Sequence, residues 1–185
     1  MQRSLQDQIS SHTHPEKDST AASRLCADCG MCCDGVLFHS VLLQSGDSSR
    51  KLASAGLKIK IKKGRSYFLQ PCPAHESNRC RIYEDRPLRC RIFNCQQLHR
   101  LFSGESTEAQ ALSKIQEARR QVDHVNHLVN QLSETNPKRG LTQRCAQALQ
   151  TDVKTARHTE LETAMEKLAL FLENQFRIKP ETNLD

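Results

Sequence analysis

The chain has 185 residues, 37% of them hydrophobic, and a formal net charge of +6. Its longest apolar runs are far shorter than the about 20 residues that a membrane-spanning helix needs, which excludes an integral membrane protein. No apolar signal-peptide core opens the sequence, so we expect a cytoplasmic protein that has no membrane partner. The nine cysteines are then informative, because clustered thiols in a reducing compartment are more often metal ligands than disulfides.

Charge and cysteine content divide the chain into three predicted parts. Residues 1–25 are polar and are expected to form a flexible N-terminal tail. Residues 26–100 contain eight of the nine cysteines, and the stretch 50–100 carries a net charge of +10, so we predict a basic cysteine-cluster metal-binding module. Residues 101–185 carry a net charge of −1 and are predicted to form a helical C-terminal region.

The module opens with short signals for regular structure. An apolar run over residues 36–43 predicts a short strand. Asp47 or Ser48 can then cap a short helix over residues 52–55. Gly56 is expected to end this helix, because glycine is favoured just after the last helical turn.

A β-hairpin is the clearest element of the module. Apolar residues and lysines alternate from 57 to 62, which is the period of a strand with one solvent-exposed face. Lys63 and Gly64 provide a turn, and residues 66–69 are expected to return as the second strand. These elements and the helices that follow predict an α+β fold, in which a small metal-organised module with a hairpin adjoins a C-terminal helical segment.

Three helices are predicted to follow the module, over residues 106–133, 141–149 and 153–178. The first has apolar residues three and four positions apart, which is a helical a/d seam, and Thr107 or Ser106 can cap its start. We expect these apolar stripes to pack against one another or against the module, and a dimerising coiled coil is the alternative. The seam of the first helix consists of Ala111, Ile115, Ala118, Val122, Val125, Val129 and Leu132.

Two runs of cysteines carry the candidate chemistry of the chain. A Cys-x-x-Cys step lets two thiolates reach one centre, and such steps fill the first run. Zinc takes four such ligands in a tetrahedron, and an iron–sulfur cubane takes four thiolates around a larger core. We therefore predict zinc or iron as the cofactor, with an iron–sulfur cluster as one form of it. The predicted metal ligands are Cys26, Cys29, Cys32, Cys33, Cys72, Cys80, Cys90 and Cys95.

Eight thiols divide into two sets of four, or into one site with spare thiols. Cys32 and Cys33 are adjacent, and adjacent side chains diverge, so both are poorly placed to serve one compact ion. One of them is expected to join Cys26 and Cys29, while the other points to a second site. This partition follows from local geometry, and the sequence leaves open which cysteine goes where.

Three further residues resemble ligands without being predicted as such. Cys145 stands alone on an apolar helical face, where a small buried core residue is the more frequent role. His39 and His75 lie inside the module and can bind metal. Eight cysteines already fill two sites, so neither histidine is included in the predicted set.

The motif reads Cys26-x-x-Cys29-Gly30-x-Cys32-Cys33, then Cys72-Pro73, then Cys80-x-Ile82-Tyr83-x-x-Arg86-Pro87-x-x-Cys90-Arg91-x-Phe93-x-Cys95. This pattern resembles the CxxCxxCC family of zinc- or iron-chelating proteins, also called YkgJ-type cysteine-cluster proteins. The resemblance covers residues 26–95 and implies metal binding without a defined reaction. The pattern is also similar to the cysteine-rich part of flagellin lysine N-methylases, where methyl transfer is linked to an iron–sulfur cluster.

Metal binding would explain part of the positive charge of the module. Four thiolates on a zinc ion or on an oxidised four-iron cluster leave a charge of about −2, so two filled sites would bring about −4. Five arginines beside the cysteines can offset this charge and donate hydrogen bonds to sulfur. They are Arg79, Arg81, Arg86, Arg89 and Arg91.

The remaining cations gather in the Lys58–Arg65 hairpin, away from the cysteines in sequence. A hairpin with this charge can bind an acidic protein or a nucleic acid as its partner, although a solvated edge whose lysines prevent aggregation is the more frequent role of such residues. Only Tyr67 and Phe68 lie near these lysines, which leaves few aromatic rings for stacking on bases.

Three classes of function fit the sequence. The favoured one is a protein that chelates zinc or iron through up to eight thiolates, so that the metal organises a binding or regulatory surface. The alternatives are an iron–sulfur-dependent enzyme related to protein lysine N-methylases and a zinc-type nucleic-acid-binding module. The sequence contains no glycine-rich nucleotide loop and no recognisable catalytic triad, so it assigns no reaction.

The helices are also expected to pack on the module, which has only a small core of its own. The predicted members of this core are Val36, Leu37, Phe38, Val41, Leu43, Ile59, Ile61, Phe68, Ile82, Tyr83 and Phe93. A chain that ends at Gly104 should then still bind metal, because all eight predicted ligands precede it. It should be less stable than the full chain, since it exposes apolar surface that the helices cover.

Overall fold

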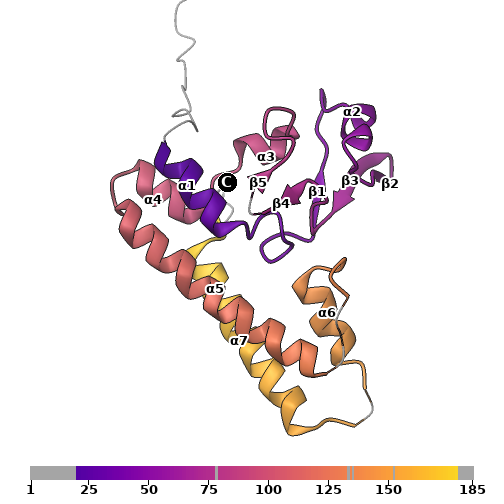
Figure 1. The fold of residues 1–185 in the computed structure, drawn as a ribbon, viewed down its shortest axis with the longest axis vertical. Helices are drawn as coiled ribbons and strands as arrows, with labels where there is room; N and C mark the ends of the chain where they lie inside the picture. Colours follow the sequence, from indigo (N-terminus) through magenta and orange to yellow (C-terminus); the bar gives the residue numbers. More distant parts are fainter. Residues whose placement is uncertain (1–19, 78, 133, 135, 152, 179–185) are drawn as a thin grey trace, which may run out of the picture.

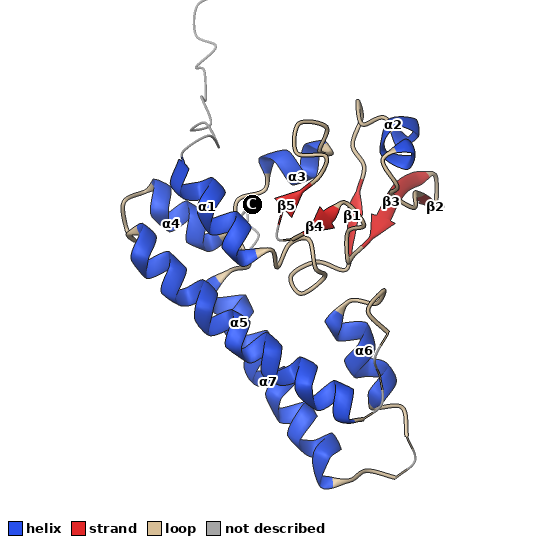
Figure 2. Cartoon of the chain, in the orientation of Figure 1, coloured by secondary structure: helices blue, strands red, loops and turns tan. Residues whose placement is uncertain are grey.

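The longer helices occupy one region of the molecule, and the strands occupy another together with short helices, as Figures 1 and 2 show. The computed structural model describes residues 20–77, 79–132, 134, 136–151 and 153–178, so residues 1–19 of the predicted tail lie outside the described residues. The helices are α1 (Thr20–Cys29), α2 (Ser49–Ser54), α3 (Leu88–Ile92), α4 (Gln96–Phe102), α5 (Glu108–Gln131), α6 (Leu141–Ala148) and α7 (Ala156–Gln175). The strands are β1 (Ser40–Leu42), β2 (Lys60–Lys62), β3 (Arg65–Leu69), β4 (His75–Glu76) and β5 (Arg79–Cys80). The predicted α+β fold is confirmed.

The larger sheet has three antiparallel strands in the order β1-β3-β2. Lys62 pairs with Arg65 across the hairpin turn, where Lys63 and Gly64 both have positive φ, at 51° and 72°. A two-residue turn of this kind has the twist that the flanking strands require. The predicted hairpin is therefore confirmed, although its first strand begins only at Lys60.

Of the other predicted elements of the module, the strand is shorter than expected and the helix agrees with its prediction. β1 covers only the end of the predicted strand 36–43, because the chain before it turns back and the Leu37 N–H donates to the Met31 carbonyl at 2.9 Å. α2 agrees with its prediction, since the Ser48 hydroxyl caps it by accepting from the Lys51 N–H at 3.2 Å. β4 and β5 form a small hairpin that the sequence did not predict.

The predicted seam of α5 is confirmed and is covered within the chain. Thr107 and Gln110 form a capping box at its start, and six of the seven seam residues are buried. α7 lies along α5, and α1 packs against the first half of α5. The seam is therefore buried by helices of the same chain, whereas in the alternative prediction a second chain would bury it in a coiled coil. No helix in the described residues has the length and apolar character needed to cross a membrane.

α1 begins inside the segment that was predicted as a tail. Ala22 and Leu25 are each only 2% exposed, and they belong to the same core as α5 and α7. Arg24 fixes the helix from outside through two hydrogen bonds of 2.8 Å to the Glu108 carboxylate. Residues 20–25 are therefore part of the helical half rather than of the predicted tail.

The buried side chains form two separate cores. The helical core takes residues from α1, α4, α5, α6 and α7, together with Met31, Val36 and Leu37 from the loop after α1. The sheet core is smaller and consists of Val41, Leu52, Leu57, Phe68 and Ala74, with half-buried neighbours around them. The boundary between these cores runs through the cysteine module, and it does not coincide with the predicted division at residue 100.

Two predicted core residues of the module are exposed instead. Ile61 is 75% exposed, because it lies on the edge strand β2 opposite Ser66, beyond the area that the sheet core covers. Tyr83 is 38% exposed, and the Arg86 guanidinium stacks on its ring at 3.5 Å from the centroid. The predictions that these two side chains contribute to a core are wrong.

Candidate metal centre

Four of the predicted ligands come together at the end of α1. Cys26 and Cys29 lie one turn apart on this helix, Cys32 follows in the next turn, and Cys95 is the N-cap residue of α4. Burial raises the pKa of Cys32 well above its usual value, and negative charge on Cys29, Cys95, Cys33 or Cys26 would raise it further. Because such effects weaken with distance, they identify these thiols as neighbours.

The pKa of Cys29 shows the same neighbours. Burial raises it to about 12, the Met31 backbone N–H lowers it, and the charges of Cys95 and Cys26 raise it. We name Cys26, Cys29, Cys32 and Cys95 the first thiol set. In this set, Cys29 is buried in the helical core, and Cys32 and Cys95 are half-buried against it.

The other four predicted ligands come together behind the sheet. Burial raises the pKa of Cys33 to about 12, and the charges of Cys72, Cys90 and Cys80 raise it further. Burial likewise raises the pKa of Cys90 to about 11, with Cys72 and Cys80 as its neighbouring thiols. We name Cys33, Cys72, Cys80 and Cys90 the second thiol set, and Cys72 and Cys90 pack against the sheet core.

The division between the two sets falls on the peptide bond that joins Cys32 to Cys33. The Cys33 carbonyl accepts a hydrogen bond of 2.7 Å from the Cys72 N–H, which ties Cys33 to its own set. The Cys32 carbonyl accepts from the Gln70 side-chain amide at 3.0 Å. The neighbouring thiols of Cys32 and Cys33 therefore differ, while the division of the eight predicted ligands into two sets of four stays a prediction.

Gly30 lies at the point where α1 ends and the two sets approach each other. Its φ is +59°, and its N–H donates to the Cys26 carbonyl at 3.0 Å. A Cβ at this position would lie 2.9 Å from an Arg119 nitrogen and 3.1 Å from Cε1 of His75. His75 also pairs with Cys80 in the β4–β5 hairpin, so this residue lies close to Gly30 as well as to a member of the second thiol set.

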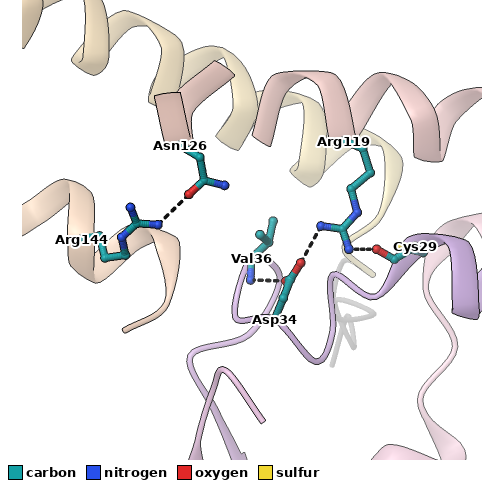
Figure 3. A network of polar contacts seen from close by, with 6 residues as sticks. All are labelled: Cys29, Asp34, Val36, Arg119, Asn126 and Arg144. Atoms are coloured by element: carbon teal, nitrogen blue, oxygen red, sulfur yellow. Dashed lines mark hydrogen bonds and ion pairs between the residues drawn. The ribbon is translucent and has the colours of Figure 1, made fainter. Parts of the chain in front are cut away.

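Arg119 connects the long helix α5 to the loop that carries the adjacent cysteines (Figure 3). One of its terminal nitrogens donates to Asp34 Oδ2 at 2.6 Å, and the other donates to the Cys29 carbonyl. Asp34 also accepts from the Val36 N–H at 3.0 Å through Oδ1. Both charged side chains are only 26% exposed, so water screens this pair less than it screens a surface pair. The same view shows α6 held to α5 through Arg144 and Asn126.

Replacing Arg119 with alanine should lower the free energy of unfolding by about 1–3 kcal/mol, because Asp34 and the Cys29 carbonyl both lose a charged donor. Thermal melting of the full chain measures this change. Arg120→Ala is the matched control, since Arg120 is exposed and pairs only with Glu117 three residues earlier on the same helix. The control should cost less than about 0.5 kcal/mol. Equal losses in the two variants would contradict the connecting role of Arg119.

The arginines of the module affect the second thiol set through space. Positive charge on Arg81 lowers the pKa of Cys72, and Arg86 lowers that of Cys90, although burial of each thiol outweighs this effect. Their hydrogen bonds go to backbone oxygens, from Arg81 to Pro73 and from Arg86 to Tyr83. Three other arginines of the module are exposed: Arg79, Arg89 and Arg91.

The remaining cysteine agrees with its prediction. Cys145 on α6 is fully buried in the helical core, and burial raises its pKa to about 11. Among the described residues, no three or more His, Cys, Asp or Glu side chains are arranged so that they could hold a metal ion as they stand. The roles of the eight clustered thiols as ligands therefore stay a prediction.

Some residues at this site gave little or no signal in the sequence. Asp34 directly follows Cys33, so its position marks it as a candidate neighbour of the thiols. Arg119 lies 24 residues after Cys95 inside a helix of ordinary composition, and only the packing of α5 against α1 brings it to the site. His75 was weighed as a ligand and set aside, and the structure places it beside Gly30.

Comparison with known protein families identifies the region that contains both thiol sets. Residues 25–115 match the model of the CxxCxxCC family, which is described as a putative zinc- or iron-chelating domain. The match includes all eight clustered cysteines and the first turns of α5. Comparisons with curated proteins and with solved structures give no match. The resemblance of the cysteine pattern to the CxxCxxCC family is therefore confirmed over residues 25–115.

Proposed function

We propose that this protein chelates metal in two centres, each held by four thiolates. The first centre takes the first thiol set, and the second centre takes the second set. The observation that carries this proposal is the difference in neighbouring thiols between the two adjacent cysteines. Cys29 and Cys95 act most strongly on Cys32, whereas Cys72, Cys90 and Cys80 act on Cys33.

The spacing of the first set favours an iron–sulfur cluster in the first centre. Bacterial ferredoxins hold a four-iron cluster with a Cys-x2-Cys-x2-Cys run and a distant fourth cysteine, and the next cysteine of the run serves the other cluster. Cys26, Cys29 and Cys32 have this spacing, Cys95 is the distant fourth residue, and Cys33 belongs to the other set. Four thiolates suit either zinc or iron in the second centre.

The two centres have a structural role in this proposal. Cys29, Cys32 and Cys95 of the first set pack in the helical core, and Cys72 and Cys90 of the second set pack against the sheet core. Metal in both centres would therefore hold the two cores together on either side of the bond between Cys32 and Cys33. The protein is then a metal-organised scaffold whose surfaces are available for partners. No described contact favours an enzyme of the lysine N-methylase type.

Anaerobic purification with a visible spectrum and elemental analysis tests this proposal. A brown protein with broad absorption near about 400 nm and iron together with acid-labile sulfide would support the cluster in the first centre. A colourless protein with about two zinc ions per chain would support two centres but contradict the cluster. A protein that retains neither metal, and gains none when reconstituted under reducing conditions, would contradict both centres.

Metal binding should tighten steeply as the pH rises. Burial raises the pKa of Cys33 to about 12 and that of Cys90 to about 11, so both thiols are protonated in the metal-free chain at neutral pH. A thiol must lose its proton to bind, so each bound thiolate releases one proton and raising the pH favours the bound state. Zinc competition against a chromophoric chelator between about pH 6 and 8 should give a slope of about four in log K per centre. A slope near zero would contradict binding through buried thiols.

A further inference from the structure

The surface opposite the sheet core is the second chemically distinctive site of the molecule. The strand register places Tyr67 between Leu42 of β1 and Lys60 of β2, and it places Arg65 opposite Lys62. Because side chains alternate along a strand, these residues share one face of the sheet. Val41 and Phe68 lie on the opposite face, where they are buried in the sheet core.

This outer face is hollowed into a shallow, open groove of about 470 Å³. Half-buried Tyr67 lines it together with two half-buried leucines, one from β1 and one from β3. Cations and polar groups complete the lining, and no carboxylate is part of it. The lining residues are His39, Ser40, Leu42, Lys62, Lys63, Arg65, Tyr67 and Leu69.

The cations of this face have no anionic partner among the described residues. Residues 57–69 contain five basic side chains and no acidic one. In the part of the chain that the structure describes, none of these five forms an ion pair, whereas seven pairs occur elsewhere. Uncompensated charge of one sign around an apolar and aromatic patch is complementary to a polyanion that carries flat apolar groups.

We propose that this outer sheet face binds single-stranded nucleic acid. Lys60, Lys62 and Arg65 contact the phosphates, and one base stacks on the Tyr67 ring. Lys60 and Lys62 are two residues apart on one strand, about 6.8 Å, which suits successive phosphates of an extended strand. An acidic protein would satisfy the cations as well, but a nucleic acid carries a flat base beside every phosphate, which suits cations that surround an aromatic and apolar floor.

This inference goes beyond the metal centres and does not depend on which metal they hold. The sheet core separates the groove from the second thiol set, since Phe68 of β3 faces that core while Tyr67 faces the groove. Substitutions on the outer face are therefore expected to leave metal content unchanged. Metal analysis of each variant shows that a loss of binding arises at the groove and not from loss of a centre.

Fluorescence anisotropy of the full-length, metal-loaded chain with labelled 12-nucleotide oligo(U) and oligo(dT) tests the proposal. Binding should weaken about a hundredfold between about 50 and 200 mM salt if all five cations contribute. The triple variant Lys60→Gln, Lys62→Gln, Arg65→Gln should reduce the slope of log K against log salt by about 2. Tyr67→Ala should weaken binding by about five-fold to a hundredfold, whereas Tyr67→Phe keeps the ring and should retain affinity.

A charge-matched variant separates the groove from the overall charge of the protein. Lys114→Gln, Lys138→Gln, Lys167→Gln removes three exposed lysines outside the groove and should weaken binding much less than the groove triple. Equal effects of the two triples would overturn the proposal, as would the absence of binding at low salt. The proposal would also be overturned if a poly-glutamate peptide bound as tightly as the oligonucleotides and Tyr67→Ala left both affinities unchanged. This result would indicate an acidic protein partner.

Discussion

Replacing Cys32 with serine should empty the first centre and leave the second filled, whereas replacing its neighbour Cys33 should do the reverse. The two side chains belong to different thiol sets, although one peptide bond joins them. Apparent binding energies of about 10–16 kcal/mol for four-ligand zinc sites give about 2.5–4 kcal/mol per ligand. Loss of one thiolate should therefore weaken its own centre by about a hundredfold or more. Metal analysis and the visible spectrum of the two full-length variants measure this result.

The pair of variants has an internal control in Cys145→Ser. Cys145 lies in the helical core away from both sets, so this change should leave the metal content as it is. Identical metal loss from Cys32→Ser and Cys33→Ser would mean that the eight thiols form one joint site. Loss from Cys145→Ser with none from Cys95→Ser would mean that the set of ligands is wrong.

The fold could be predicted from the sequence wherever a pattern repeats over several turns or a turn sequence allows few conformations. The α5 seam repeats over several turns, and the Lys63-Gly64 turn has few alternative conformations, so both were predicted correctly. α1 had a signal too short to predict a helix, because its buried residues, Ala22, Leu25 and Cys29, have helical spacing over only about two turns. Its helical state depends on packing against α5, which no local pattern reports.

The composition of the candidate site was predictable, but its arrangement was not. The cysteine spacing indicated metal ligands and suggested that Cys32 and Cys33 diverge. It could not show that Cys95 joins the first set and Cys90 the second, because both come from the same run and only the course of α3 and α4 separates them. The spacing of the cysteines also could not predict contacts from distant helices, such as the hydrogen bonds of Arg119 to Asp34 and to the Cys29 carbonyl.

The two cores make the two centres separable, which changes the expectation for a chain that ends at Gly104. Such a chain retains all eight thiols, so residue count alone predicts full metal binding. The helical core, however, loses 13 of its 20 buried residues with α5, α6 and α7. Every buried residue of the sheet core precedes Gly104, so that core stays complete.

The truncated chain should therefore retain the second centre and lose the first. Metal analysis after reconstitution should show about one centre per chain instead of two, and melting should occur at a lower temperature than in the full chain, since apolar surface of α1 is exposed. Full retention of both centres would show that α1 and the loop after it fold without α5. Loss of both would show that the sheet core depends on the helices.

Two full-length variants extend this comparison without removing chain. Ile115 is 3% exposed in the helical core, and Leu52 is 3% exposed in the sheet core. An unpaired buried carboxylate costs several kcal/mol, so Ile115→Asp should loosen the helical core and empty the first centre. Leu52→Asp should instead empty the second centre, because Cys72 and Cys90 pack against the core that Leu52 fills. If either variant emptied both centres equally, the two halves would form one cooperative unit rather than two cores joined at Cys32 and Cys33.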